Sequence, residues 1–293
     1  MSLTIITLTA IPPRFPYLNE TLNSLLAQDA AISAVELWLP RSYRRFAFDP
    51  ATDIPMVPKG VTVRIVDEDM GPATKILPSV RAHRGEDVNL IFCDDDKVYD
   101  PGWVARLLAG SIQHPGCCIV EEGGDIRHNS THDWSGPNLP RAGRPFKDWR
   151  YRLRRALSLG MWKPRKNQTS GYVDILEGWG GVLVRPEFFT DAAFHIAPDL
   201  WMIDDIWLSG QLALNAIPIW LTVEENIRSK GNSNEVRDAA LRFQTVDGKG
   251  RTALNQGGID YFRETYGIWG GKGFVKPDDM TQSKASDPLF ARP

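Results

Sequence analysis

Alternating strand and helix patterns in the first 120 residues constrain the fold of this 293-residue chain more than any other feature. Short β-branched runs predict strands at Leu3–Leu8, Val35–Leu39, Val61–Val66, Val88–Cys93 and Cys117–Val120. Helical patterns lie between them at Tyr17–Gln28, Ala73–Ala82 and Trp103–Ile112. Such alternation implies right-handed crossovers and a sheet covered on both faces. We therefore predict an α/β fold with a mainly parallel central sheet flanked by helices.

Three consecutive aspartates, Asp94, Asp95 and Asp96, follow the fourth predicted strand in the stretch IFCDDDKVYDPGW. Unpaired carboxylates near a core are costly, so either a solvated turn or a bound cation must offset their charge. Ligands bind at the carboxyl ends of the strands in open parallel sheets. Mg²⁺ and Mn²⁺ take carboxylate oxygens, and Mg²⁺ commonly binds phosphates at the same time. Asp94 and Asp96 therefore form a D-x-D candidate metal site, in which the ion would neutralise a departing diphosphate.

Two acids, Asp204 and Asp205, begin a predicted helix in MIDDIWLSGQLALN. Acids at this position stabilise a helix by capping its free N–H groups and by opposing its dipole. Alternatively, a carboxylate at a helix start that faces a cleft serves as a general base for an acceptor hydroxyl. Both interpretations remain open from the residues alone.

A lysine, Lys75, follows the turn Gly71-Pro72 in EDMGPATKI, in the first turn of the next predicted helix. The helix dipole slightly disfavours a cation at that position. Lys75 therefore either meets an anion bound at the same helix end or is an exposed surface lysine.

Several familiar motifs are absent from the sequence. It contains no phosphate loop GxxxxGK[ST], no HExxH and no GxSxG, and EGWGGVL lacks the last glycine of a dinucleotide fingerprint. An EF-hand loop starting at Asp94 would need an acid or amide in place of Val98 and a glutamate in place of Ala105. These classes of site are excluded.

Charge and cysteine content narrow the function classes. A net charge of −2 argues against a general nucleic-acid-binding surface. Cys93, Cys117 and Cys118 form neither a metal-binding spacing nor an even disulfide framework, which fits a reducing compartment. The start, MSLTIITLTA, lacks a basic region and precedes Pro12 and Pro13, so we interpret it as a strand rather than a signal peptide. We expect a cytoplasmic protein.

Residues 141–166 contain ten lysines or arginines and one acid, Asp148. A basic amphipathic helix is predicted, with its apolar stripe formed by Phe146, Trp149, Leu153, Ala156, Leu157 and Gly160. One interpretation is peripheral contact with the anionic inner face of a membrane, which would present the protein to a lipid-linked acceptor. The other is a lid that grips the donor's phosphates or an acidic acceptor.

Five segments together resemble the GT-A glycosyltransferases, in particular the family-2-like bacterial enzymes. They span roughly residues 3 to 220 and are TIITLTAIPPRFPYLNETLNSLLAQ, DEDMGPATKILP, IFCDDDKVYDPGW, EGWGGVLVRPEFF and DDIWLSGQLA. The resemblance implies a single GT-A domain over residues 1–274, with a smaller acceptor-side subregion. Within it we expect a nucleotide-sugar-binding half (1–120), a basic, partly mobile insertion (121–170) and an acceptor or catalytic half (171–274). Residues 275–293 are expected to form a flexible tail.

The resemblance also implies roles on the donor side. Asp96 would be the first metal ligand and Asp94 the supporting one, with Asp95 between them in the same donor site. Further donor contacts are implied near the base, ribose or phosphates for Thr9, Arg14, Asp67, Asp69 and Lys75. The bound groups would be a UDP-sugar and Mn²⁺ or Mg²⁺.

On the acceptor side, Asp205 matches the second acid of the family's x-E-D motif, the usual catalytic base of inverting members. The glycine-rich segment with Trp179, Gly180 and Gly181 resembles the loop that shapes the donor-sugar and acceptor pocket. Two features depart from the family pattern: Asp204 replaces the glutamate of x-E-D, and no histidine follows His195 as a late metal ligand. The segment EENIRSKGNSN offers Arg228 or Lys230 to the diphosphate instead.

The resemblance therefore implies a hexosyltransferase of bacterial glycan or glycolipid synthesis. It would move a sugar from a nucleoside-diphosphate donor, expected to be UDP-linked, to an acceptor hydroxyl with inversion. A nucleotidyltransferase acting on a sugar phosphate is an alternative, but it would usually need a Gly- and Arg-rich loop after the first strand, and TAIPPRFP has only Arg14. A non-catalytic protein of the same fold that binds a nucleotide sugar or a carbohydrate is the second alternative.

Overall fold

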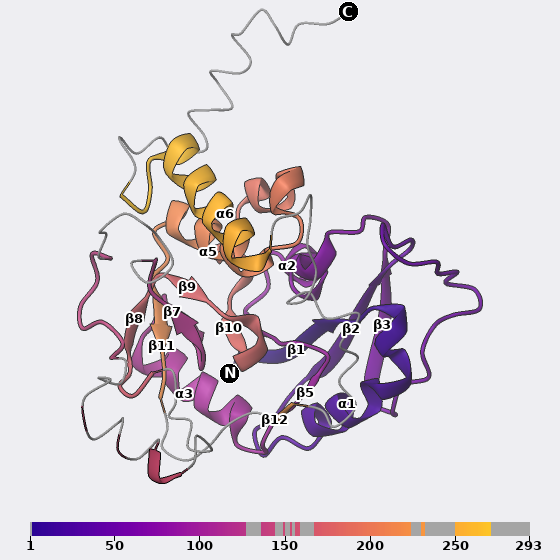
Figure 1. Ribbon diagram of the computed structural model, residues 1–293. Helices are drawn as coiled ribbons and strands as arrows, with labels where there is room; N and C mark the ends of the chain where they lie inside the picture. Colours follow the sequence, from indigo (N-terminus) through magenta and orange to yellow (C-terminus); the bar gives the residue numbers. More distant parts are fainter. Residues whose placement is uncertain are drawn as a thin grey trace, which may run out of the picture.

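The computed structural model describes residues 2–126, 136–143, 167–223 and 250–270, together with residues 149, 153, 156–158 and 230–231 (Figure 1). Most of the predicted basic helix in 141–166 lies outside the described residues. The predicted tail 275–293 and Arg228 lie outside them entirely. No helix within the described ranges is long and apolar enough to cross a membrane.

The described strands form one central sheet of eight strands, in the order β3-β2-β1-β4-β10-β6-β11-β8. Their bounds are β1 Leu3–Thr9, β2 Ala34–Pro40, β3 Val61–Val66, β4 Val88–Phe92, β6 Cys118–Val120, β8 Gly171–Val173, β10 Val182–Val184 and β11 Ile219–Leu221. The pairs β1–β2, β2–β3, β1–β4 and β6–β11 are parallel, whereas β10 runs antiparallel to β4 and β6, and β8 antiparallel to β11. The predicted α/β fold with a mainly parallel sheet is confirmed.

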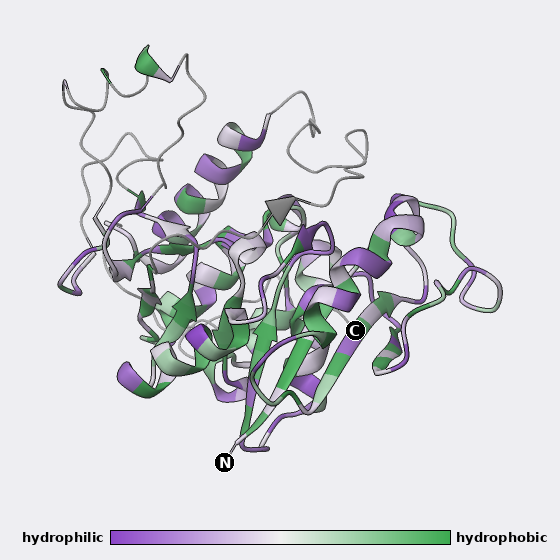
Figure 2. Cartoon of the chain, turned by 90° about the horizontal axis from the view of Figure 1, so that it is seen from below, coloured by the Kyte–Doolittle hydropathy of each residue, from purple (hydrophilic) through white to green (hydrophobic). Residues whose placement is uncertain are grey.

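Helices cover both faces of this sheet. Their bounds are α1 Leu18–Leu26, α2 Leu77–Ala82, α3 Trp103–Gln113, α5 Asp204–Leu214 and α6 Arg251–Tyr266. The buried side chains of α1 and α3 belong to one apolar cluster, and those of α2, α5 and α6 to another. Alternation along the strands supplies both clusters, since Ile6 and Leu8 face the first and Ile5 the second. Figure 2 shows the central strands as largely apolar, in contrast to the mixed surfaces of the helices.

Short elements complete the described structure. The small strands are β5 Lys97–Val98, β7 Gly123–Gly124, β9 Ile175–Leu176 and β12 Lys230–Gly231, which form the antiparallel pairs β5–β12 and β7–β9. The 3₁₀ turns are η1 Pro12–Tyr17, η2 Gly71–Lys75, η4 Gly178–Gly180, η5 Pro186–Phe188, η6 Asp191–Phe194 and η7 Pro198–Leu200. Among them, η1, η2 and η4 lie next to the strand ends at which ligands are expected.

The predicted helix Ala73–Ala82 is wrong in its first half. The chain forms the 3₁₀ turn η2, leaves helical geometry at Ile76, and starts α2 at Leu77 with Pro78 in its first turn. Pro78 has no N–H to donate to an earlier carbonyl, so it favours a new helix start over a continuous helix. Lys75 therefore ends η2 and does not lie in the first turn of α2, contrary to the sequence prediction.

Candidate active site

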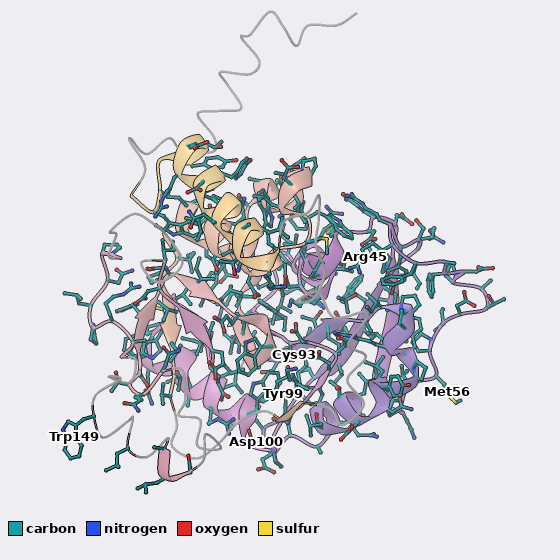
Figure 3. The ribbon with its side chains drawn as sticks, in the orientation of Figure 1. Arg45, Met56, Cys93, Tyr99, Asp100 and Trp149 are labelled. Carbon is teal, nitrogen blue, oxygen red and sulfur yellow. The ribbon has the colours of Figure 1, made fainter. Side chains whose placement is uncertain are left out.

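A pocket of about 630 Å³ opens beside the carboxyl ends of β1, β2 and β4. It is lined by ten of the predicted site residues: Thr9, Arg14, Asp69, Lys75, Asp94, Asp95, Asp96, Trp179, Asp204 and Asp205. Figure 3 labels two other lining residues, Cys93 after β4 and Arg45 in the connection between β2 and β3. The structure thus brings residues from both halves of the chain to one cavity.

Each carboxylate of the aspartate triplet is paired with a cation of the protein. Asp94 lies 2.7 Å from the Lys75 ammonium, and the guanidinium of Arg14 contacts Asp95. Asp96 is paired with Lys97 at 2.8 Å and with Arg14 at 3.2 Å. The clustered negative charge near the core is therefore offset by side chains from η1, η2 and β5.

The surroundings shift the pKa values of Asp94 and Asp95 in opposite directions. Burial raises the pKa of Asp95 to about 6, against the opposing effect of Arg14. Burial would also raise the pKa of Asp94, but the charge and hydrogen bond of Lys75, together with the charges of Lys97 and Arg14, outweigh it, so the pKa of Asp94 lies below its ordinary value. Burial opposes the charge of Arg14, yet the attraction of Asp95 and Asp96 raises the pKa of that guanidinium.

Lys75 connects the triplet with the second pair of acids. Its ammonium is 2.7 Å from Asp94 Oδ1 and 2.8 Å from Asp204 Oδ2, and only 6% of its side chain is exposed. Burial lowers the pKa of Lys75, but Asp204 and Asp94 raise it well above its ordinary value, so the ammonium stays charged. The alternative of an exposed surface lysine is therefore wrong.

Asp205 is a partly buried acid, with 18% of its side chain exposed, and its two oxygens have different partners. Oδ1 accepts a hydrogen bond from the backbone N–H of Gly178 at 3.0 Å, and Oδ2 is 3.6 Å from the guanidinium of Arg251. Burial and the charge of Asp204 raise the pKa of Asp205 to about 7, although Lys75 and Arg251 lower it. An acid with this pKa can exchange a proton near neutral pH, as general-base catalysis requires.

The helix-capping interpretation of Asp204 and Asp205 does not match their contacts. They are the first two residues of α5, but the N-cap position is taken by Ile203, whose side chain makes no capping hydrogen bond. The two carboxylates bind Lys75 and the N–H of Gly178 instead. Acids at a helix start still interact favourably with its dipole, but here their contacts connect α5 to η2 and η4.

The glycine-rich segment EGWGG fits closely against its neighbours. A Cβ at position 178 would lie 2.5 Å from the Lys75 ammonium nitrogen, and Gly181 has φ +96°, where a Cβ would overlap the ring of Trp103. The carbonyl of Trp179 accepts a hydrogen bond from Tyr99, and that of Gly180 accepts one from Trp103. Trp179 lines the pocket, whereas Gly180 and Gly181 do not; Gly180 packs against Glu122 and Gly181 against the ring of Trp103.

The remaining predicted donor residues differ in position. Asp69 lines the pocket, and its carboxylate accepts hydrogen bonds from the backbone N–H groups of Arg44 and Gly71. The Thr9 hydroxyl donates to the carbonyl of Trp38. Asp67 lies outside the pocket lining, with a side chain that is 87% exposed and paired with Arg41.

Several lining residues were not predicted from the sequence. They are Tyr43, Arg45 and Phe46 after β2, Trp201 before α5, and Arg251 and Asn255 on α6. The run RSYRRFAF could have been found, because it directly follows a strand whose carboxyl end faces the ligand side of a parallel sheet. Arg251 and Asn255 have no comparable signal, since they lie some 45 residues beyond the Asp204-Asp205 motif on a helix of their own.

The carboxylates that line the pocket suit a hard divalent cation that also binds phosphate. Asp94 and Asp96 offer carboxylate oxygens at the pocket surface, and these are the ligands that Mg²⁺ and Mn²⁺ prefer. Within the described residues no three side chains of the types His, Cys, Asp or Glu form a complete metal site. The residues therefore suit an ion held by one or two carboxylates together with a diphosphate.

Neither a protein-family model nor a curated protein matches the sequence. Among solved structures, S. aureus TarS residues 1–349 is similar at 12% identity and a TM-score of 0.42, with 77% of this chain and 59% of that chain covered. GalNAc-T7, crystallised with UDP, GalNAc and Mn²⁺, is similar at 14% identity and a TM-score of 0.46, with 76% of this chain and 42% of that chain covered. The likeness is one of fold, and the chain spans less than two thirds of either protein.

Proposed function

We propose that this chain is a glycosyltransferase that moves a hexose from a UDP-linked donor to an acceptor hydroxyl with inversion. The observation that carries the proposal is that Asp205, with a pKa raised to about 7 by burial and by Asp204, lies in the same pocket as the aspartate triplet. A base and a site for an anionic leaving group are the two parts that such a transfer needs.

In the proposed reaction, Asp205 takes the proton of the acceptor hydroxyl while the hydroxyl oxygen forms a bond to the anomeric carbon. The bond from that carbon to the diphosphate oxygen breaks on the opposite side, and the diphosphate leaves with both electrons. The N–H of Gly178 holds one oxygen of Asp205 in place, so the carboxylate is oriented before the substrate arrives.

Positive charge for the leaving group would come from two sources. Asp94 and Asp96 would hold a divalent cation, which supplies Lewis-acid stabilisation of the diphosphate when bound. Arg14 and Lys97 line the same part of the pocket and add fixed positive charge near the triplet. The acceptor is proposed to be a glycan or a lipid-linked sugar.

The test is release of UDP from a panel of UDP-sugars with Mn²⁺, with and without added acceptors. Asp205→Asn should lower the rate about 10²–10⁴-fold, the usual contribution of general-base catalysis, and should keep UDP affinity. Asp199→Asn makes the same chemical change at an exposed position outside the pocket lining and should leave the rate unaltered.

Three outcomes would contradict the proposal. Retained activity in Asp205→Asn would remove that residue from the role of base. UDP binding without sugar release for any donor would indicate a binding protein of this fold. Release of pyrophosphate from a nucleoside triphosphate and a sugar phosphate would indicate a nucleotidyltransferase.

A further inference from the structure

We infer that Lys75 is a positioning residue that fixes the aspartate triplet and the Asp205 helix relative to each other, by holding Asp94 and Asp204 on one buried ammonium. The role assigned to Asp205 rests on the proposed function, whereas the bridge itself is a feature of the fold. This inference differs from the expectation that Lys75 serves mainly as a ligand of the nucleotide or its diphosphate.

The bridge joins two parts of the site that come from different segments of the chain. Asp94 follows β4, Asp204 begins α5, and Lys75 ends η2 between them in space. Both nitrogen–oxygen distances are below 3 Å, at 2.7 and 2.8 Å, and the ammonium is almost fully buried. At this burial a charged pair interacts strongly, and loss of one partner leaves an uncompensated charge.

Lys75 is itself held in a defined position. The Thr7 hydroxyl of β1 donates a hydrogen bond to the carbonyl of Lys75 at 2.8 Å, which fixes η2 on the central sheet. The backbone at Gly178 lies so close to the ammonium that a Cβ there would be 2.5 Å away. A lysine with an anchored backbone and a confined ammonium can transmit a fixed spacing to the two carboxylates that it binds.

The position of Asp205 depends on the same contacts. Asp205 is the neighbour of Asp204 in the first turn of α5, and its carboxylate is held by the N–H of Gly178 beside Lys75. The Ser209 hydroxyl donates to the carbonyl of Asp205 and accepts from the N–H of Leu176, which ties the same turn to β9. Loss of the Lys75 bridge would therefore leave Asp204 without its cation while Asp205 kept only its backbone contacts and Arg251.

A positioning role and a phosphate-binding role predict different kinetics. A misplacement of about 1 Å at a reacting group costs about 10² in rate, so loss of a positioning residue lowers kcat. Loss of a phosphate ligand that acts equally in the ground and transition states raises KM and weakens UDP affinity, with kcat unchanged. The two cases can be separated by measuring both constants.

The experiment compares Lys75→Met, Asp204→Asn and the double variant, with UDP affinity measured by calorimetry and kcat and KM measured from UDP-sugar hydrolysis. We expect Lys75→Met to lower kcat about 10²-fold, and any weakening of UDP binding through the lost positive charge to be smaller than this loss in kcat. The double variant should be hardly worse than Lys75→Met alone, because both substitutions remove the same contact. Asp204→Asn conserves the side-chain shape and carries the same expectation if Lys75→Met does not fold.

The matched comparison is Lys97→Met, since Lys97 is paired with Asp96 and no contact joins it to Asp204 among the described residues. Its effects should multiply with those of Asp204→Asn, whereas those of Lys75→Met should not. Weakened UDP affinity with unchanged kcat in Lys75→Met would overturn the inference, and so would multiplicative effects of Lys75→Met and Asp204→Asn.

The bridge can be tested even if the wild-type protein turns over no nucleotide sugar. In that case the proposed function fails, and the same double-mutant cycle is measured on the free energy of unfolding. Non-additive unfolding free energies for Lys75→Met and Asp204→Asn would support the bridge without any catalytic assay. Additive values would overturn it, whatever the protein's activity.

Discussion

The raised pKa of Asp205 predicts a pH-dependent gain in stability when the residue is replaced by asparagine. Folding moves this pKa from 3.8 to about 7, because burial and the charge of Asp204 disfavour the carboxylate. The protonated form is therefore favoured in the folded state. Its contribution to stability is complete below pH 3.8 and is lost as the pH rises to about 7.

The size of the effect follows from this shift. Each unit of pKa difference is worth about 1.4 kcal/mol, so ionised Asp205 should cost the folded protein about 4 kcal/mol above pH 7. At pH 5, which is only about one unit above the pKa of the unfolded chain, the loss of folding stability relative to low pH is near 2 kcal/mol. Asp205→Asn keeps the acceptor for the N–H of Gly178 and never ionises. The stability difference between variant and wild type should therefore widen by about 2–3 kcal/mol from pH 5 to pH 8.5.

The assay is urea unfolding of both proteins at several pH values in metal-free buffer. Subtraction of the wild-type curve cancels the titration of other groups, including Asp95 with its pKa of about 6. Asp199→Asn at an exposed site should show a difference that does not change with pH. A pH-independent difference for Asp205→Asn, or a variant less stable than wild type at pH 8.5, would refute the electrostatic account of this residue.

Two further predictions concern the glycine-rich segment and the metal. Gly178→Ala should lower both stability and activity, because its Cβ would lie 2.5 Å from the Lys75 ammonium nitrogen. The control is Gly257→Ala on α6, where the space around a Cβ is open. This substitution should stabilise the protein by up to about 1 kcal/mol. Urea unfolding and UDP release measure the two effects, and equal effects of the two substitutions would contradict the packing argument. Mn²⁺ with UDP should raise Tm more than either alone in the wild type, and Asp96→Asn should abolish that synergy; an undiminished synergy would remove Asp96 as a ligand.

The sequence predicted the long strands and the acid motifs because their signals are local. Five β-branched runs appear as strands with bounds within one residue of the expected ones, and the triplet Asp94–Asp96 follows β4 as expected. The strands β8, β10 and β11 were missed; like β6, which was predicted, each has only three residues, so a period of two cannot distinguish such strands from loops. Their places in the sheet depend on tertiary pairing, which no local pattern records.

The partners of the acids could not be predicted in the same way. The pairs of Lys75 with Asp204 and of Arg251 with Asp205 join residues distant in the sequence, so only the fold brings them together. The local structure around Lys75 was predicted wrongly for a related reason. The sequence pattern placed a helix start at Ala73, whereas Lys75 ends η2 and α2 begins at Leu77. Sequence motifs therefore indicate the candidate charged residues, but their ion-pair partners can be found only from the folded structure.

The charges that line the pocket favour the proposed entry of a UDP-linked donor together with a cation. Among the described residues the lining contains seven carboxylates but five cationic side chains, which are Arg14, Arg45, Lys75, Lys97 and Arg251. With all acids ionised, a diphosphate alone would enter a region that is already negative, and at low local dielectric such repulsion is costly. A divalent cation that binds with the diphosphate would remove this repulsion. The triplet is already paired with Arg14, Lys75 and Lys97, but these side chains do not offset the added charge of the diphosphate, so the proposed ion is still needed. The protein's own cations stabilise the acids before the substrate arrives, and the ion would balance the charge that the donor brings.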